Sequence, residues 1–448
     1  MKENKMGTME VRRLILTMSL PIMISMLVQA LYNIVDSMFV ARVSEAALAA
    51  VSLCYPIQMI MVAVACGTGV GINALLSRYL GEKKQEKASQ VAMHGLFCAI
   101  CNWLVFAVIG LFFSEAFLRL FSDDVQIIMM GISYMQICTI CSFGVFVQIT
   151  YERIMQSTGN TIYNMVIQGV GALINIILDP IFIFGLGPVP ALGTAGAAIA
   201  TVIGQIVAMF LGIIITQKKV REIQLSVRGF HIDGMIMKAM YRIAIPAILM
   251  QSIMSFMTVM MNMILAPFSE MAVSVFSIYY KLQQFVFMAV LGMNNALIPI
   301  LSYNYGANQM ERIREGIRFA LWMSCVIMAI GTVVFQLLPT QLLYLFDAKE
   351  AMLSIGIPAL RTISVSFVFA GISMVLCSVF QALGSPNHSL LVTLLRQMVI
   401  LLPLAYGFSS AFGLDMCWWS FPITEVLCAL LSLYLLRSVQ KRVLLQLQ

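Results

Sequence analysis

Long apolar runs separated by short polar segments cover almost the whole chain. Twelve of these runs reach roughly 20 residues or more, the length that a helix needs to cross the hydrocarbon core of a bilayer. The pattern therefore predicts an all-α polytopic membrane protein with twelve transmembrane helices. We expect them near residues 14–40, 47–76, 89–117, 125–152, 163–187, 191–215, 241–266, 272–301, 317–345, 351–380, 388–411 and 415–436.

The composition agrees with a membrane location. Of the 448 residues, 61% are hydrophobic and 10% are charged, whereas about a quarter of the residues in soluble domains are charged. The net charge of +7 does not indicate a nucleic-acid partner, because most Lys and Arg lie in short segments between the apolar runs. The first run is itself full length, so we expect no removable signal peptide.

The basic residues also predict the orientation of the chain. Twenty Lys and Arg fall on one side of the predicted topology, and Arg42, Arg119 and Lys349 fall on the other. Basic loops are retained in the cytoplasm, so we expect both termini to be cytoplasmic, in the cell inner (plasma) membrane. An even number of helices independently requires both ends to lie on one side of the membrane.

Cysteine and histidine give no sign of a metal or redox centre. Two cysteine pairs have CxxC spacing, but both lie inside apolar runs, where sulfur usually serves as a small packing group. The three histidines are far apart in the sequence. We therefore expect no cofactor, and no metal beyond a coupling ion. The residues concerned are Cys98, Cys101, Cys138, Cys141, His94, His231 and His388.

The two halves of the chain are repeats of each other. Adding 225 to positions between Pro21 and Gly159 pairs similar residues without a gap. The polar stretch that begins at residue 216 separates six predicted helices from six others. We expect an N-terminal lobe at 1–215, a cytoplasmic linker at 216–240 and a C-terminal lobe at 241–448. Examples of the pairing are Pro21 with Pro246, Tyr55 with Tyr280, Ser77 with Ser302, and Gly131 with Gly356.

Repeats of six helices both begin on the cytoplasmic side, so they are parallel and related by an axis along the membrane normal. Such pairs suit alternating access, in which two bundles rock around a site between them. The alternative is an old duplication that now serves stability alone. Polar groups that differ between the halves favour transport.

The first predicted helix, 14–40, contains one charged residue, Asp36. A carboxylate within a spanning helix is costly, by about 2.5–3.5 kcal/mol at its centre, and usually faces a cavity or a partner. Tyr32 precedes Asp36 by four residues and shares its face of the helix. Pro21 removes a backbone hydrogen bond, so we expect the helix to bend there.

The fifth predicted helix carries a second acidic position. Asn175 and Asp179 are four residues apart and lie on one helix face. Asp36 and Asp179 each lie a few residues before an outer loop, so we expect them at similar depth and in one pocket. Two carboxylates in a dehydrated pocket repel each other and resist ionisation. Together with amide and hydroxyl oxygens they hold either a proton or a small hard cation such as Na⁺.

This acidic site is confined to the first half. In the second half Asp36 pairs with Met261, and the Asn175 and Asp179 positions map near Ile400 and Leu404. The alternative to an ion site is that Asp179 only caps or kinks its helix before Pro180, with Asp36 interfacial.

Charged residues in the other runs are less specific. Lys281, with Gln284 beside it, either faces the cavity of the second bundle or extends outward to the membrane surface. The remaining charges are as consistent with structural ion pairs or helix ends as with a site. They are Arg153, Arg361, Arg396 and Glu425.

These residues and several longer motifs resemble the multidrug and toxic compound extrusion (MATE) family of cation-coupled antiporters. The likeness covers nearly the whole chain. It rests on Pro21, Tyr32 and Asp36 and on SEAALAAVS (44–52), GTGVGINALLSRYLGEKK (67–84), QSTGN (156–160), NIILDP (175–180), GTAGAAIATVIGQ (193–205) and IPILSYNYGA (298–307).

The resemblance implies two lobes around a V-shaped central cleft and a cation site in the N-lobe. The residues that match this site are Asp36, Asn175, Asp179 and Thr201, with Tyr32 lining the cavity and Pro21 at the bend of the first helix. We assign Gln29, Asn33, Lys281 and Gln284 to the substrate cavity as well. The seventh helix, Ile245–Phe268, lacks the acidic residue of some members, which makes the chain more similar to the DinF-like branch.

We therefore expect a monomeric H⁺- or Na⁺-coupled antiporter, not an enzyme, that lies in the lipid bilayer and exports lipophilic organic cations or amphiphiles, such as drugs or toxic metabolites. One alternative is a lipid-linked precursor flippase of the same superfamily, which Lys281 keeps open. The other is an intramembrane aspartyl enzyme that uses the two Asp residues, although no matching catalytic motif is visible.

Overall fold

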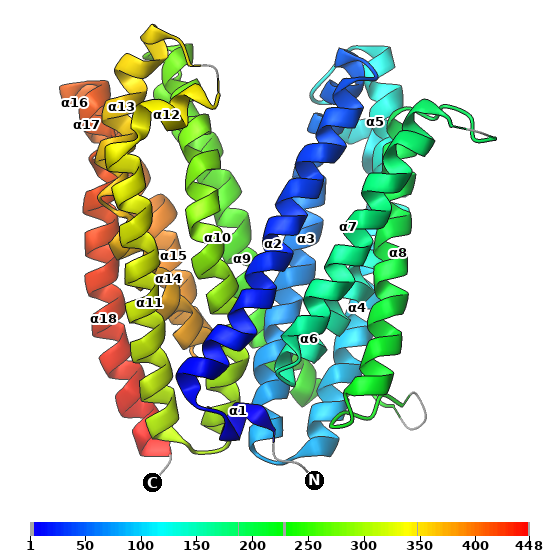
Figure 1. Ribbon diagram of the computed structural model, residues 1–448, viewed down its shortest axis with the longest axis vertical. Helices are drawn as coiled ribbons and strands as arrows, with labels where there is room; N and C mark the ends of the chain where they lie inside the picture. The colour runs from blue at the N-terminus through cyan, green and yellow to red at the C-terminus, as the bar shows by residue number, and fades with distance from the viewer. Residues whose placement is uncertain (1–3, 187, 227–229, 347, 447–448) are drawn as a thin grey trace. The chain divides into compact units, whose positions relative to one another are not determined.

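The computed structural model describes residues 4–186, 188–226, 230–346 and 348–446, and in these ranges it contains helices and loops without a strand (Figure 1). Ten of the described helices are long and apolar enough to cross a membrane, and two bent helix pairs bring the number of possible spans to twelve. The predicted all-α, multi-pass architecture is therefore confirmed.

The helices of the first half are α1 (Lys5–Thr8), α2 (Val11–Ala41), α3 (Glu45–Gly81), α4 (Gln85–Arg119), α5 (Val125–Ile140), α6 (Phe143–Ser157), α7 (Thr161–Phe184) and α8 (Thr194–Lys219). Those of the second half are α9 (Gly234–Leu265), α10 (Glu270–Gly306), α11 (Met310–Leu337), α12 (Pro339–Tyr344), α13 (Glu350–Ser364), α14 (Phe367–Ala382), α15 (Pro386–Leu394), the π-helical turn η1 (Leu395–Val399), α16 (Leu401–Phe412), α17 (Leu414–Cys417) and α18 (Ser420–Gln446).

Contacts between the helices group the chain into two compact units. The N-unit comprises Leu20–Ile248 with Asn4, and the C-unit comprises Lys5–Ser19 and the chain from Leu249 onward. Each unit therefore includes the opening turns of a helix that ends in the other: α2 changes unit after Ser19, and α9 after Ile248. The polar segment 216–240 belongs to the N-unit.

A proline lies close to each of these two passages. Pro21 follows Ser19 by two residues in α2, and Pro246 precedes Ile248 by two residues in α9. Both helices continue through their proline without interruption. Because proline lacks the N–H of the helical hydrogen bond, each connecting helix is weakened where it passes from one unit to the other.

The opening turns of α2 and α9, which belong to a different unit from the rest of their helix, pack against glycines. In the N-unit, a Cβ at Gly67 would lie 2.4 Å from Ile248 Cγ1 and 2.8 Å from its backbone nitrogen. In the C-unit, a Cβ at Gly316 of α11 would lie 3.4 Å from Val11 Cγ1. A side chain at Gly67 would therefore displace α9 at Ile248 from its packing in the N-unit.

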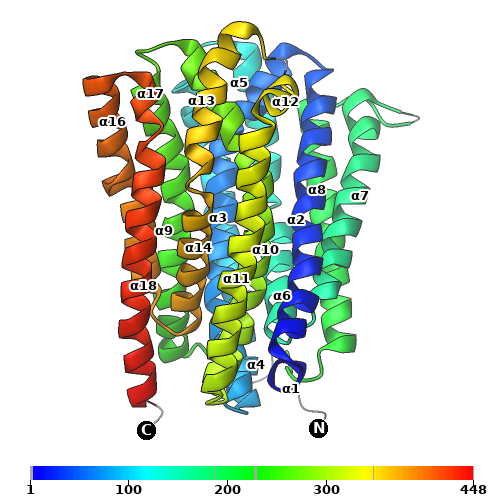
Figure 2. The ribbon, with the colours of Figure 1, turned by 60° about the vertical axis from the view of Figure 1, so that its left-hand side comes forward.

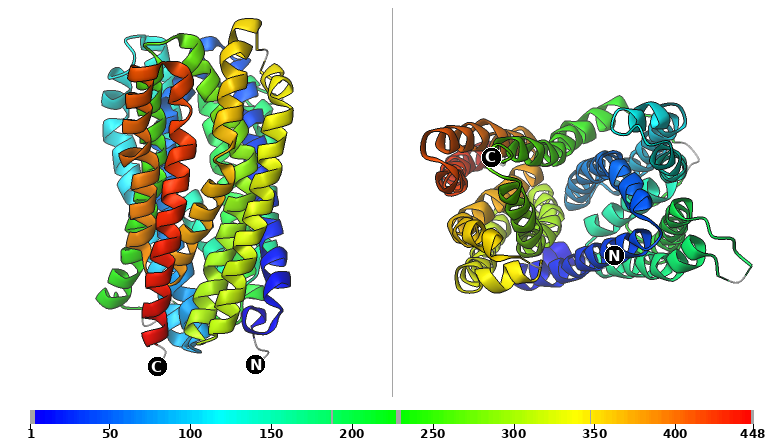
Figure 3. Two further views of the ribbon diagram at one scale, coloured as in Figure 1. Left: turned by 90° about the vertical axis from the view of Figure 1, so that its left-hand side faces the viewer. Right: turned by 90° about the horizontal axis from the view of Figure 1, so that it is seen from above.

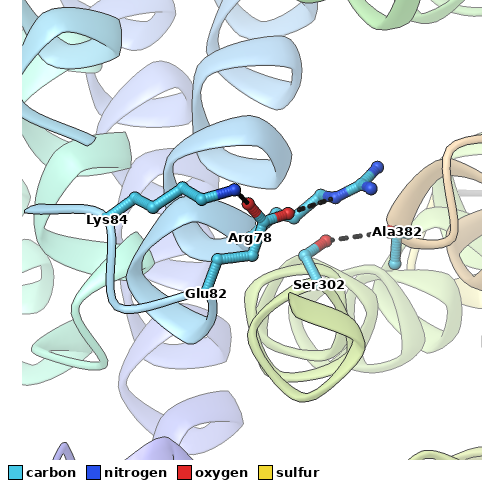
Figure 4. A network of polar contacts seen from close by, with 5 residues as sticks. All are labelled: Arg78, Glu82, Lys84, Ser302 and Ala382. Atoms are coloured by element: carbon cyan, nitrogen blue, oxygen red, sulfur yellow. Dashed lines mark hydrogen bonds and ion pairs between the residues drawn. The ribbon is translucent and has the colours of Figure 1, made fainter. Parts of the chain in front are cut away.

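The two halves repeat the same local structure 225 residues apart. Ser77 Oγ donates to the Ser157 carbonyl at 3.2 Å. Ser302 Oγ donates to the Ala382 carbonyl at 3.1 Å, as Figure 4 shows. Lys83 and Asn308 both adopt left-handed conformations, with φ of 58° and 56°. These matches confirm that the sequence register describes a structural repeat.

Two predicted helices are each broken into a bent pair, which corrects the sequence analysis. The run 125–152 forms α5 and α6, bent by 42°, and the run 351–380 forms α13 and α14, bent by 49°. At both breaks, serine or threonine hydroxyls bond to backbone carbonyls of the preceding turn, which competes with helical bonding. These bonds come from Thr139, Ser142, Ser364 and Ser366.

The limits predicted for one further helix were wrong. The helix expected at 317–345 begins at Met310 and ends at Leu337, and Pro339 then starts the short helix α12. The span expected at 388–411 is present as Pro386–Phe412, with the π-helical turn η1 inside it.

Within each unit a central helix organises the core. In the C-unit α14 packs against α10, α11 and α18 (Figure 2), with Phe367 and Phe380 fully buried. In the N-unit α8 packs against α5, α6 and α7. In the C-unit, α1 and the last turns of α18 lie at the same end (Figure 3, left).

Candidate functional site

Close packing of α7 on α8 builds one wall of the site in the N-unit. A Cβ at Gly204 of α8 would lie 2.7 Å from the Gly171 carbonyl oxygen and 3.4 Å from Asn175 Cβ. Only a residue without a side chain allows the two backbones to approach so closely. Thr201, one helical turn before Gly204, is thereby placed next to Asn175.

Asn175 connects the two helices. In the orientation that satisfies its hydrogen bonds, its side-chain carbonyl accepts from Thr201 Oγ1 and from the Thr201 backbone nitrogen, both at 3.1 Å, and its nitrogen donates to Asp179 Oδ2 at 3.2 Å. Asn175 and Asp179 are buried, with 3% and 0% exposure. The amide therefore holds the Asp179 carboxyl and the Thr201 hydroxyl in one polar cluster.

Asp36 joins this cluster from α2. Its carboxyl lies within hydrogen-bonding reach of the Asp179 carboxyl, while its Oδ1 is buried and has no hydrogen-bond partner among the described residues. Two carboxyl groups form a hydrogen bond only when a proton lies between them. The pair is therefore suited to bind a proton, or a cation in its place.

Aromatic and amide groups surround the two carboxyls. Tyr32 of α2 lies close enough to interact electrostatically with both Asp36 and Asp179. Sequence analysis missed Tyr134 of α5, which is buried near Asp36 and accepts a hydrogen bond from Gln58 at 3.1 Å. Nothing in the sequence distinguishes Tyr134 from other tyrosines in apolar runs.

The other predicted residues do not join the cluster. Pro21 is buried in α2, whereas Gln29 and Asn33 are exposed on the same helix. Lys281 and Gln284 are exposed on α10 and belong to the C-unit.

The corresponding place in the C-unit is apolar. Met261 replaces Asp36 and is fully buried, and Ile400 follows the π-helical turn η1. Of the uncertain charges, Arg396 and Glu425 form a buried ion pair, with Nε 2.6 and 2.8 Å from the two carboxylate oxygens. This pair joins η1 to α18 within the C-unit.

A further buried acid of the N-unit, Glu152 of α6, was also missed by the sequence analysis. Its two oxygens accept hydrogen bonds from Gln148 at 2.9 Å and from Gln168 at 3.0 Å, and the side chain is 4% exposed. Each oxygen of this carboxylate thus has an amide donor, unlike Oδ1 of Asp36.

The donor set of the cluster limits what it can bind. In the described ranges no three His, Cys, Asp or Glu side chains come together as a metal site. The cluster instead offers carboxyl oxygens from Asp36 and Asp179, an amide oxygen and a hydroxyl. Oxygen donors of this kind suit a hard cation, and the adjacent carboxyls suit a proton.

Comparison with known proteins places this chain in a family. The MatE family model matches residues 21–181 and again residues 246–407. The chain belongs to the MATE family. The two matches begin at Pro21 and Pro246, so they follow the same register as the internal repeat. This chain is accordingly a membrane transporter rather than an enzyme, and the predicted DinF-like branch stays a prediction.

Individual MATE proteins are similar over nearly their whole length. The chain is 27% identical over 427 residues to the multidrug export protein MepA of Staphylococcus haemolyticus. The alignment covers 95% of this chain and 93% of the relative. Among solved structures, a MATE transporter in the bent conformation aligns with a TM-score of 0.92 and 26% identity, covering 99% of both chains. A structure in the straight conformation aligns with a TM-score of 0.91, also at 26% identity, and covers 99% of this chain and 98% of its own.

Proposed function

We propose that this MATE protein is an antiporter that exports lipophilic organic cations in exchange for H⁺ or Na⁺. The observation that carries the proposal is the Asp36–Asp179 cluster with Asn175 and Thr201 in the N-unit. The similarity to a multidrug export protein supports the direction and the broad substrate range.

The coupling ion binds at the carboxyl pair. A proton between Asp36 and Asp179 relieves the repulsion of two buried charges, and Na⁺ does the same with Asn175 and Thr201 as neutral oxygen ligands. The unpartnered Oδ1 of Asp36 supports a further ligand at this position, because buried polar atoms are normally hydrogen-bonded.

The binding event is transmitted through α2. Asp36 and Pro21 lie on this one helix, and α2 changes unit just before Pro21. Solved relatives in straight and bent conformations support a bend as the moving part. For exchange to be coupled, the ion and the substrate must favour different states of the helix.

The driving force follows from charge. Each elementary charge that crosses the membrane contributes about 2.3 kcal/mol per 100 mV. One-for-one exchange of monovalent cations moves no net charge, so the ion gradient alone drives it.

The substrate contacts proposed for the N-unit are Tyr32 with the exposed residues Gln29 and Asn33 of α2. For the C-unit they are Lys281 and Gln284. We place the monomeric protein in the plasma membrane with both termini cytoplasmic. The position of α1 and the end of α18 at the same end of the C-unit supports this orientation.

Lys281 also favours a second candidate function. An exposed lysine within a spanning helix suits the pyrophosphate of a lipid-linked precursor, so flipping of such a lipid is the alternative. Transport of an organic cation under an ion gradient distinguishes the two functions. An antiporter should carry the organic cation, whereas a flippase that recognises an anionic lipid-linked precursor should not.

The test uses inside-out vesicles that contain the wild type, Asp36→Asn or the control Asp123→Asn, which removes a carboxylate from an exposed loop. A fluorescent organic cation is supplied outside under a proton or a sodium gradient. We expect gradient-driven uptake in the wild type and the control and none in Asp36→Asn. Equal uptake by wild type and Asp36→Asn would refute the proposed ion site.

A further inference from the structure

An open groove of about 640 Å³ lies in the C-unit, at the end that contains α1 and the start of α11 (Figure 1). One side is Arg12 of α2, and the other is the first three turns of α11. The lining residues on α11 are Glu311, Arg314, Glu315, Arg318, Phe319 and Trp322.

The chain repeat provides an internal comparison for this groove. In the N-unit the corresponding helix is α4, where Ser89, His94 and Phe97 occupy the places of Arg314, Phe319 and Trp322 in the 225-residue register. In the N-unit this helix face is covered by the chain itself.

Three contacts from the polar segment after α8 cover it. The Gln224 backbone nitrogen donates to Ser89 Oγ at 3.0 Å, and the Asp233 nitrogen donates to His94 Nε2 at 2.8 Å. The ring of Phe230 lies with its centroid 5.1 Å from that of His94 and 6.3 Å from that of Phe97. This helix face is therefore covered in the N-unit, whereas its counterpart on α11 in the C-unit is an open groove.

The charges in the C-unit groove indicate the chemistry of its occupant. Glu315 is paired with Arg12, whose Nε lies 3.4 Å from Oε1. Arg314 and Arg318 are exposed one turn apart on the same face, with Glu311 as the remaining acid. Two adjacent guanidinium groups are well suited to hold a phosphate.

The groove becomes apolar along α11. The rings of Phe319 and Trp322 are stacked with centroids 6.1 Å apart, and Trp322 is 62% exposed. The exposed row continues through Val326, Ile330 and Val333, each three or four residues further along the helix. A ligand that follows this face meets cations first, then aromatic rings, then aliphatic side chains.

We propose that the groove binds one anionic phospholipid. Its headgroup phosphate contacts Arg314 and Arg318, and an acyl chain lies over Phe319 and Trp322 along α11. The C-terminal segment of the chain is a poorer occupant, because Arg437 and Lys441 carry the same charge as the groove. The proposal rests on the cytoplasmic orientation proposed above, but its test measures lipid binding and does not depend on export.

The test is native mass spectrometry of the detergent-purified protein titrated with phosphatidylglycerol or phosphatidylcholine. The variant is Arg314→Gln/Arg318→Gln, and the matched control is Lys218→Gln/Lys219→Gln, which removes two exposed charges from the end of α8. At about 1 kcal/mol for each basic residue, the variant should bind phosphatidylglycerol about 30-fold more weakly than wild type and control.

Equal binding of phosphatidylglycerol by the variant and the control, or equal binding of both lipids by the wild type, would overturn the proposal. Displacement of the lipid by an equal concentration of inorganic phosphate would assign the site to free phosphate and also overturn it. A second measurement needs no arginine variant: phosphatidylglycerol with brominated acyl chains should quench wild-type fluorescence more than it quenches that of Trp322→Phe. Identical quenching would contradict a lipid over Trp322.

Discussion

Replacing Gly204 with alanine tests whether the close approach of α7 and α8 builds the ion site. The new Cβ would lie 2.7 Å from the Gly171 carbonyl oxygen, where ordinary contact begins at 3.4 Å. The obstacle is backbone and cannot rotate away, so the helices must separate by about 0.7 Å to restore normal packing. Such overpacking costs about 1–3 kcal/mol.

The separation has a direct effect on the cluster. The bonds from Thr201 to Asn175 are 3.1 Å long, and lengthening them by about 0.7 Å takes them beyond hydrogen-bonding distance. Two lost bonds at about 0.5–1.5 kcal/mol each correspond to a roughly 5- to 150-fold weaker site. We therefore expect Gly204→Ala to raise the coupling-ion concentration that gives half-maximal uptake by at least about fivefold.

The assay is ion-dependent uptake of the fluorescent cation into vesicles, together with thermal unfolding of the purified protein. Gly169→Ala is the control, because it makes the same change on α7 where nothing lies within 4 Å of the new Cβ. The control should keep its ion dependence and its stability, or gain up to about 1 kcal/mol from better helix propensity. If both variants depended on the ion in the same way, the packing argument would be refuted.

Two further predictions concern charges outside the proposed ion site. Glu425→Gln should destabilise the protein by about 3–5 kcal/mol in denaturant unfolding, because it leaves Arg396 buried without a counter-charge; retained stability would show that water reaches the pair. Burial tends to raise the pKa of Glu82, but hydrogen bonds from Lys84 and Arg78 outweigh it and lower that pKa (Figure 4). The stabilisation is therefore present above the ordinary glutamate pKa and is lost as the pH falls through the lowered one. Glu82→Gln should lose less than about 1 kcal/mol at pH 7, and this loss should vanish in acid; a loss that grows in acid would contradict the sign.

The spans could be predicted because the bilayer imposes an apolar length on each of them. Their ends could not all be predicted, because a helix can continue beyond its apolar stretch, as in the charged opening turns of α11. The breaks within the fourth and tenth runs were also invisible. They occur at Ser and Thr side chains such as Thr139 and Ser364, which are common inside apolar runs and do not mark a break in the sequence.

Some residues of the candidate site could also be predicted from the sequence, and others could not. Spacing alone placed Asn175 and Asp179 on one face and gave Asp36 a similar depth, because helical geometry is regular. Thr201 came only from the family resemblance, since the approach of α7 to α8 depends on glycines whose role is visible only in three dimensions. Tyr134 could not be found, because its place near Asp36 depends on how α5 packs.

The most direct test of the account is uptake of a fluorescent organic cation into inside-out vesicles under an imposed proton or sodium gradient, with Asp36→Asn beside the wild type. The account predicts uptake that one of the two gradients drives and that disappears in Asp36→Asn while Asp123→Asn retains it. Undiminished gradient-driven uptake by Asp36→Asn would contradict coupling through the carboxyl pair of the N-unit.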